Sequence, residues 1–248
     1  MITRRLTYGR LLAELSLSGV RAFLRPSTLA IDDTVRQMRS IGAGAVPTAS
    51  LISMAAGFVL ALVLEVQLSP VGQAQMIPTL LWVILTEQVV PVGVALIFVG
   101  RSVSAVTAEL GAMQVSEEVK ALFTMGIDVV PYLLLPRFLG FQLMLPVVTL
   151  AGIYASLLGG WLLCGLMLHM PLSEYVFYAL DGSLFSSVLL ALAKSGLFGF
   201  IIAVISIYKG MNVRHGSREI SQATTESVVT SVVVITLADA AVTALELG

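Results

Sequence analysis

Long apolar stretches with few charged residues recur along the chain from residue 48 onward. Each approaches or exceeds twenty residues, and at about 1.5 Å per residue a helix of that length crosses roughly 30 Å of hydrocarbon. The third stretch is longer than one crossing requires and contains Pro146, so it predicts one tilted, kinked helix or a re-entrant pair. The predicted spans are 48–66, 79–100, 138–168, 184–207 and 224–246.

The distribution of positive charge decides between these two interpretations of the third stretch. With five spans and a cytoplasmic N-terminus, all but one of the 14 lysines and arginines fall on the cytoplasmic side. The predicted outer segments 67–78, 169–183 and 247–248 contain none, as the positive-inside rule requires. Splitting the third span would place Lys209, Arg214 and Arg218 outside. We therefore expect one continuous third span and a periplasmic C-terminus.

Residues 1–47 have a different pattern and are predicted to form a separate N-terminal region. Between Tyr8 and Leu24 the apolar residues follow helical spacing, and arginines occupy the other face. Charged residues interrupt the stretch, so it does not match the apolar core of a secretory signal. The pattern predicts an amphipathic helix that lies in the membrane interface.

Composition supports a membrane protein and excludes several other classes. Hydrophobic residues make up 57% of the chain and charged residues 12%, against about 25% charged in soluble domains. The formal net charge of −1 provides no basic field for nucleic acid, so no nucleic-acid partner is expected. The one cysteine, Cys164, can form no intrachain disulfide. The chain is predicted to be an all-α integral membrane protein.

Lys194 is the one basic residue predicted to lie in the middle of a span. An ionisable group at that depth faces a helix bundle, a partner or a water-filled cavity. Glu87 in the second span and Asp239 in the fifth are its candidate partners. Two interpretations stay open, namely an internal ion pair that fixes helix packing and a substrate-facing role.

Recognisable catalytic motifs are scarce in the sequence. It contains no GxSxG, HExxH or Walker A motif. His169 and His215 are predicted to lie on opposite sides of the membrane, so no metal site is expected. For an intramembrane lipid-modifying enzyme, the one candidate pair is His169 with Asp181. We expect a chain that is not an enzyme and that contains no cofactor.

The segment between the second and third spans, residues 101–137, has the composition of helix rather than of a simple loop. Gly111 is predicted to stop the first helix, and Ser116 to cap a second, with Glu117 and Glu118 in its first turn. That second helix is predicted over residues 116–126. It either folds back on the bilayer surface or docks a cytoplasmic subunit. Its apolar residues are Val119, Ala121, Leu122 and Met125.

Four blocks in and around this segment are distinctive: LTEQVVPVGVALIFVGR at 85–101, GRSVSAVTAELGAMQVSEEVKAL at 100–122, MGIDVVPYLLLPR at 125–137 and ISQATTESVV at 220–229. On these blocks the chain resembles the MlaE/YrbE family, the permease subunits of bacterial phospholipid ABC transporters that work with MCE-domain proteins. The resemblance covers most of residues 48–248 in order and spacing. Where the family has Arg-Glu, this chain has Thr86-Glu87, so it keeps the acid without the arginine.

The resemblance implies a homodimer of permeases, similar to the membrane domains of one class of ABC exporters. The helix at 116–126 would be the coupling helix that docks into a cytoplasmic ABC ATPase, through Glu117, Glu118, Ala121, Leu122 and Met125. ATP and Mg²⁺ would be bound by that ATPase. The other implied partners are a STAS-domain subunit and a periplasmic hexamer of MCE-domain proteins.

The resemblance also implies a phospholipid pocket lined by spans one, two and five. The expected function is transport of phospholipid between the bacterial inner membrane and a periplasmic MCE protein, for outer-membrane lipid homeostasis and asymmetry. The alternative is a stand-alone ion-coupled secondary transporter that uses Glu87, Lys194 and Asp239 as a relay. The candidate lipid-binding residues are Leu60, Leu64, Val66, Leu85, Glu87 and Lys194.

Overall fold

The computed structural model describes residues 31–180, 184–214 and 216–246, and these residues form helices and short connections without a β-strand. This confirms the all-α class for the described chain. The predicted amphipathic helix at Tyr8 to Leu24 lies outside the described residues, and so do Asp181 and His215.

Within the described part of the chain, five helical stretches are long and apolar enough to cross a membrane, which confirms the predicted number of spans there. The third is unbroken, because Pro146 lies inside one long helix without ending it. The stretches extend beyond the predicted apolar segments at one or both ends. Their bounds are Thr34–Leu68, Ala74–Val115, Val130–Met167, Ser186–Met211 and Gly216–Glu246.

The first two stretches are not regular α-helices, because π-helical turns interrupt them. The first contains α2 (Ile31–Met38), a π-helical segment (Arg39–Ala43) and α3 (Val46–Leu68). The second contains α4 (Ile77–Ile84), α5 (Val90–Phe98) and α6 (Ser104–Val115), joined by π-helical segments at Leu85–Val89 and Val99–Val103. Short 3₁₀ turns at Ser69–Val71 and Ala74–Met76 connect the two stretches.

The rest of the described chain contains two short helices and three long ones. After α7 (Glu118–Thr124) a π-helical segment (Val130–Leu134) leads into α8 (Leu135–Met167). Then follow α9 (Leu172–Leu180), α10 (Leu184–Met211) and α11 (Gly216–Glu246).

The described chain divides into two compact units. The first comprises residues 31–44, 98–144 and the described part of 197–246, and the second comprises 45–97 and the described part of 145–196.

Within the second unit, α3 packs closely on α8 through two glycines. A Cβ atom on Gly57 would collide with the backbone carbonyl of Ser156, and one on Gly159 would collide with the backbone carbonyl of Met54. Small residues let helix backbones approach closely where lipid provides no hydrophobic driving force between helices. The contact is therefore made by backbone on backbone.

The short helix α9 packs beside α4 in the same unit. The Thr79 hydroxyl donates a hydrogen bond of 2.8 Å to the carbonyl of Tyr178. The Tyr175 phenol is buried, and this burial raises its pKa. The phenol therefore stays neutral at physiological pH.

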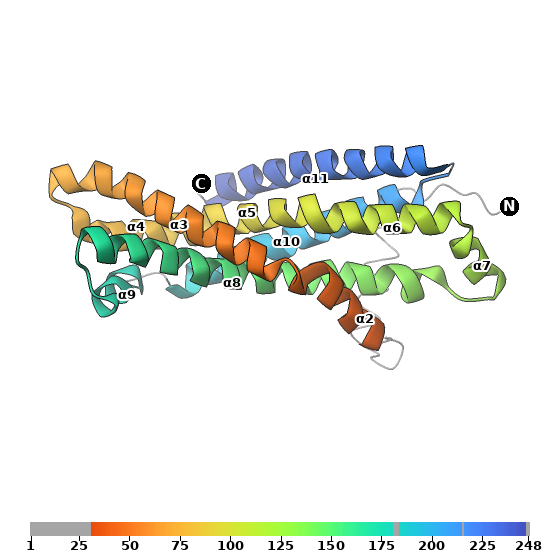
Figure 1. Cartoon of the computed structure of the whole chain (residues 1–248), viewed down its shortest axis with the longest axis horizontal. Helices are drawn as coiled ribbons and strands as arrows, with labels where there is room; N and C mark the ends of the chain where they lie inside the picture. Colours follow the sequence, from red (N-terminus) through yellow and green to blue (C-terminus); the bar gives the residue numbers. More distant parts are fainter. Residues whose placement is uncertain (1–30, 181–183, 215, 247–248) are drawn as a thin grey trace. The chain divides into compact units, whose positions relative to one another are not determined.

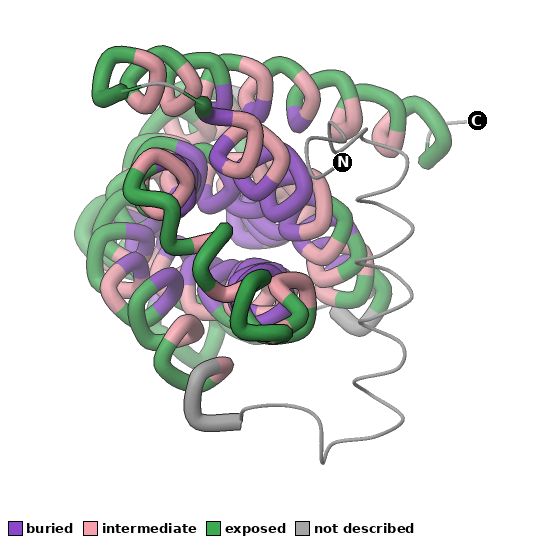
Figure 2. The backbone as a smooth tube through the Cα atoms, turned by 90° about the vertical axis from the view of Figure 1, so that its right-hand side faces the viewer, coloured by how far each residue is buried: buried purple, intermediate pink, exposed green. Residues whose placement is uncertain are grey.

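Within the first unit, α6 and α11 run side by side (Figure 1). The Thr107 hydroxyl lies 3.1 Å from the Ser227 hydroxyl and 3.3 Å from the Ser206 carbonyl, and all three residues are buried. Figure 2 shows that α11, which ends beside the label C, is exposed or half-buried over most of its length. Its exposed apolar residues are Val229, Val233, Leu237 and Leu245.

The predicted boundary between the helices near residue 116 is wrong in two respects. Gly111 does not stop a helix, because α6 continues to Val115 and Gly111 is buried against Val213 and Ile220. Ser116 is not an N-cap, since its hydroxyl hydrogen-bonds back to the Ala112 carbonyl at 3.0 Å. Glu117 takes the cap position, with a left-handed φ of 61°.

Candidate functional site

The second unit brings three of its polar side chains together between α10 and the π-helical segment Leu85–Val89. The Ser187 hydroxyl donates a hydrogen bond of 2.6 Å to the Glu87 carboxylate. The Lys194 ammonium donates a bond of 3.2 Å to the Glu87 backbone carbonyl. Ser187 and Lys194 are seven residues apart, which is two helical turns, so they project from the same side of α10. We call these three residues the polar cluster.

The local backbone explains why this carbonyl is available. The Val90 amide bonds to the Leu85 carbonyl, one residue further back than in an α-helix, and so widens the turn. A π-helical turn of this kind is rare, and it is frequent at functional sites. Residue 91 is a proline, which has no N–H to donate to the Glu87 carbonyl four residues back, so this carbonyl can accept the hydrogen bond from Lys194.

The members of the polar cluster differ in how far they are exposed to solvent. Lys194 is 1% exposed, whereas Glu87 is half-buried. The neighbouring Thr86 is fully buried, and its hydroxyl has no hydrogen-bond partner among the described residues. A buried ammonium with satisfied contacts and a partly accessible carboxylate can present a polar group to a ligand inside an apolar protein.

The other predicted lipid-binding residues lie in different surroundings. Leu85 is fully buried in the second unit. On α3, Leu60 and Leu64 are half-buried, and Val66 is 60% exposed near the end of the helix. The structure thus brings Glu87 and Lys194 together and places the α3 residues on a partly open apolar helix. Asp239, the other candidate partner of Lys194, lies on α11 in the first unit.

Ser187 was missed by the sequence analysis. A signal was present, because its seven-residue spacing from Lys194 places both on the same side of a predicted span. The π-helical turn was not predicted, because Thr86, Glu87 and Gln88 interrupt the apolar pattern without specifying the type of helix.

The second candidate site is α7, which connects α6 to the start of α8 within the first unit (Figure 1). No residue of α7 is buried, and the apolar side chains of Phe123 and Met125 are 57% and 65% exposed. The Glu117 carboxylate forms an ion pair of 3.2 Å with the Lys120 ammonium, and the Glu118 carboxylate accepts a hydrogen bond of 2.9 Å from the Ser116 hydroxyl. Leu122 is half-buried and Ala121 is exposed. The segment presents apolar and acidic groups on one exposed turn of helix.

The five apolar helices and the exposed connecting helix define a polytopic membrane protein with the features of a transporter permease. The chain belongs to the MlaE permease family, because the family model described as Permease MlaE matches residues 34–245. The resemblance stated from the sequence is confirmed.

Several relatives are similar to this protein over most of the chain. A probable ABC transporter permease protein of Rickettsia bellii is 30% identical over 93% of this chain and 88% of its own length. One of Synechocystis sp. is 29% identical over 93% of this chain and 88% of its own length. The Arabidopsis thaliana protein TRIGALACTOSYLDIACYLGLYCEROL 1, chloroplastic, is 29% identical over 84% of this chain and 59% of its own length.

The family assigns the chain to transport rather than to catalysis. An ABC transporter permease is a membrane subunit, and the family implies an ATPase partner. The candidate catalytic pair of His169 and Asp181 stays a prediction, since Asp181 lies outside the described residues.

Proposed function

We propose that the chain is the membrane subunit of an ATP-driven phospholipid transporter that moves lipid between the bacterial inner membrane and a periplasmic MCE protein. The observation that carries the proposal is the polar cluster, which lies within helices otherwise suited to acyl chains. A phospholipid has the same division, with a charged headgroup and two apolar chains. Such transport would serve outer-membrane lipid homeostasis and asymmetry.

The proposed lipid pocket combines polar residues for the headgroup with apolar residues for the acyl chains. Glu87 and Lys194 face the headgroup, while Leu60, Leu64 and Val66 contact the acyl chains and Leu85 supports the wall from the core. Burial of an acyl chain contributes about 0.8 kcal/mol per CH₂ relative to water. The Arabidopsis relative is named after a diacylglycerol glycolipid, and this name supports lipid as the class of substrate.

Energy comes from partner subunits in this proposal. Two permeases form a homodimer, and α7 of each is the coupling helix that docks on a cytoplasmic ATPase carrying ATP and Mg²⁺. ATP-driven closure of the ATPases pushes on α7, narrows the lipid pocket and expels the lipid. A STAS-domain subunit on the ATPase and a periplasmic hexamer of MCE-domain proteins complete the assembly.

The proposed orientation of the chain in the membrane rests on the distribution of its lysines and arginines. With the N-terminus in the cytoplasm and the C-terminus in the periplasm, α7 lies on the side of the ATPase. The same orientation leaves the segments 67–78 and 169–183, which contain no lysine or arginine, on the periplasmic side.

The secondary-transporter alternative rests on the same buried charges. It requires Glu87, Lys194 and Asp239 to relay ions, and it gives α7 no role. The exposed apolar residues of α7 favour the ABC permease, because an exposed apolar helix marks an interaction site.

Photocrosslinking to lipid tests the proposed pocket. A photoreactive amino acid at Glu87 should capture phospholipid in membranes that contain the whole complex. A matched probe at Tyr154, which is 69% exposed on α8, reports the background from bulk lipid. Labelling at Glu87 no stronger than at Tyr154 would mean that the polar cluster is a structural feature and not a lipid site.

A further inference from the structure

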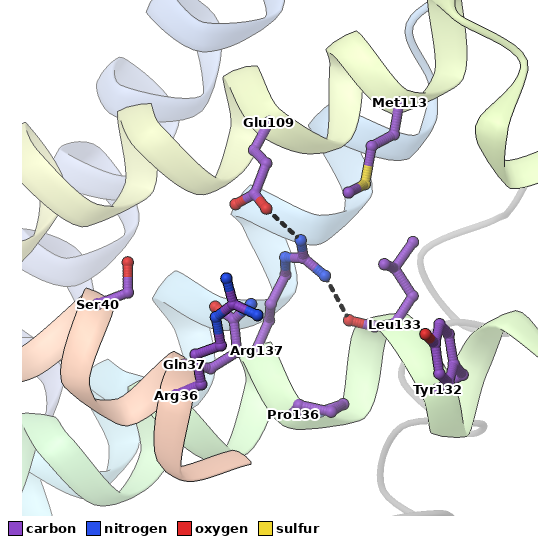
Figure 3. Close-up of a pocket in the computed structure, with 9 residues that line it drawn as sticks. All are labelled: Arg36, Gln37, Ser40, Glu109, Met113, Tyr132, Leu133, Pro136 and Arg137. Carbon is purple, nitrogen blue, oxygen red and sulfur yellow. Dashed lines mark hydrogen bonds and ion pairs between the residues drawn. The ribbon is translucent and has the colours of Figure 1, made fainter. Parts of the chain in front are cut away.

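The first unit contains a cavity of about 380 Å³ that the proposed transport pathway does not use. It lies between α2 with its following π-helical segment, the last turns of α6 and the start of α8 (Figure 3). It shares no residue with the polar cluster, which belongs to the second unit. Its hydrogen-bond donors are Arg36, Gln37, Ser40, Tyr132 and Arg137.

Arg137 is the most constrained of these donors, since its side chain is only 4% exposed. One terminal nitrogen donates to the Glu109 carboxylate at 2.6 Å, and the other donates to the Leu133 carbonyl at 2.8 Å (Figure 3). The third nitrogen, Nε, is buried and has no acceptor among the described residues. A buried guanidinium with an unused N–H is incomplete without a further acceptor.

The charge of the cavity favours an anion. Glu109 is the one carboxylate among the lining residues, and Arg137 already engages it. Arg36 lines the cavity and is exposed. Two guanidinium groups against one carboxylate leave an excess positive charge, and guanidinium groups bind phosphate oxygens through paired N–H donors.

The cavity lies near a membrane surface, because its lining residues come from the ends of three spans. Successive spans alternate in direction, so the beginning of the first, the end of the second and the beginning of the third lie on one side. The lining residues come from these three ends, which are at Thr34, Val115 and Val130.

The remaining walls are apolar and are formed by Met113, Leu133 and Pro136. Ligand pockets begin at about 300 Å³, so the cavity has room for more than a bare phosphate ion. Apolar walls beside phosphate-binding donors fit the glycerol and upper acyl carbons that adjoin a lipid phosphate.

We propose that this cavity binds the phosphate of an anionic phospholipid headgroup from the adjacent membrane leaflet, through Arg36, Arg137, Ser40 and Tyr132. The site is separate from the proposed transport pocket. A bound lipid there would join α2, α6 and α8 at the base of α7. Free inorganic phosphate could bind the same donors, but it has no glycerol or acyl carbons to contact the apolar walls. Comparing its affinity with that of a phospholipid therefore distinguishes the two possible ligands.

Binding of short-chain lipids tests the site. The purified full-length chain in detergent is titrated with dihexanoyl-phosphatidylglycerol, dihexanoyl-phosphatidylcholine and inorganic phosphate, by calorimetry. Phosphatidylglycerol should bind most tightly. Arg36→Gln, a change at an exposed residue, should weaken this binding about tenfold because a charge-assisted contact is lost. Ser40→Trp, which fills the cavity from its exposed rim, should weaken it at least as much.

Two matched controls accompany these variants. Arg218→Gln removes the same charge from an exposed position on α11 outside the cavity, and it should leave the affinity within about twofold. Glu87→Gln changes the proposed transport pocket and not the cavity, so it separates binding at the two sites. Loss of binding in Glu87→Gln alone would assign the lipid to the transport pocket and overturn the proposal.

Three further results would also overturn it. Unchanged affinity in both Arg36→Gln and Ser40→Trp would show that the cavity does not hold the lipid. Equal affinity for phosphatidylcholine would remove the role of net charge. Inorganic phosphate binding as tightly as phosphatidylglycerol would make free phosphate the ligand instead of lipid.

Discussion

At the scale of single residues, Lys194 and Glu87 decide what the second unit can bind. Lys194 is tolerated at 1% exposure because its ammonium donates a hydrogen bond to the Glu87 carbonyl in a π-helical turn. Glu87 keeps its carboxylate partly accessible while Ser187 fixes one of its oxygens at 2.6 Å. A headgroup would thus meet a carboxylate held in one orientation.

The Ser187–Glu87 hydrogen bond can be measured by a double-mutant cycle. Ser187→Ala and Glu87→Gln should each lower the free energy of unfolding, by about 0.5–2 kcal/mol for Ser187→Ala, since interhelical hydrogen bonds in membranes are modest. The coupling between them should be about 1 kcal/mol, measured by unfolding in mixed micelles. Purely additive effects would contradict the hydrogen bond. Ser195→Ala, whose hydroxyl hydrogen-bonds within α10 to the Leu192 carbonyl at 2.9 Å, serves as the comparison.

At the scale of helices, backbone contacts set the geometry of the second unit. Gly57 and Gly159 let α3 and α8 approach so closely that neither position has room for a Cβ atom. Gly93 on α5 has no atom within 4 Å of where a Cβ would lie. The two kinds of glycine look alike in the sequence, but they differ in what surrounds them.

This difference predicts opposite outcomes for the same substitution. Gly57→Ala should destabilise the protein by about 1–3 kcal/mol, because the Ser156 backbone cannot move aside cheaply. Gly93→Ala should be neutral, or should stabilise by up to about 1 kcal/mol through helix propensity. Thermal unfolding of the two variants in detergent provides the comparison. Equal effects at the two sites would mean that α3 and α8 are not in backbone contact.

The exposed apolar surface of α7 has a testable consequence for the proposed partner. Phe123→Ser should lower recovery of the ATPase in pull-downs at least about tenfold, since exposed aromatic anchors dominate interfaces. Stability should change by less than about 0.5 kcal/mol, because Phe123 is 57% exposed. Val35→Ser, at a 49% exposed valine on α2, is the matched control and should leave recovery unchanged. Full ATPase recovery with Phe123→Ser would exclude α7 as the docking helix.

At the scale of the whole molecule, the sequence allowed the five spans, the single third span and the family to be predicted. Span length and hydropathy are summed over about twenty residues, so one irregular turn hardly changes them. The π-helical turns, the role of Ser187 and the cavity around Arg137 were not predictable, because each depends on which helices meet. Gly111 shows the same limit: its sequence context suggests a helix stop, but packing against Val213 and Ile220 keeps it inside α6.

The central claim is that this chain works as the lipid-binding membrane subunit of an ATPase-driven assembly. Native mass spectrometry of the complex, extracted gently through a tag on this chain, tests that claim most directly. We expect two copies of this chain, two ATPase subunits and bound phospholipid. A bare chain with neither ATPase nor lipid, under conditions that preserve other membrane assemblies, would contradict the claim and favour the ion-coupled secondary transporter.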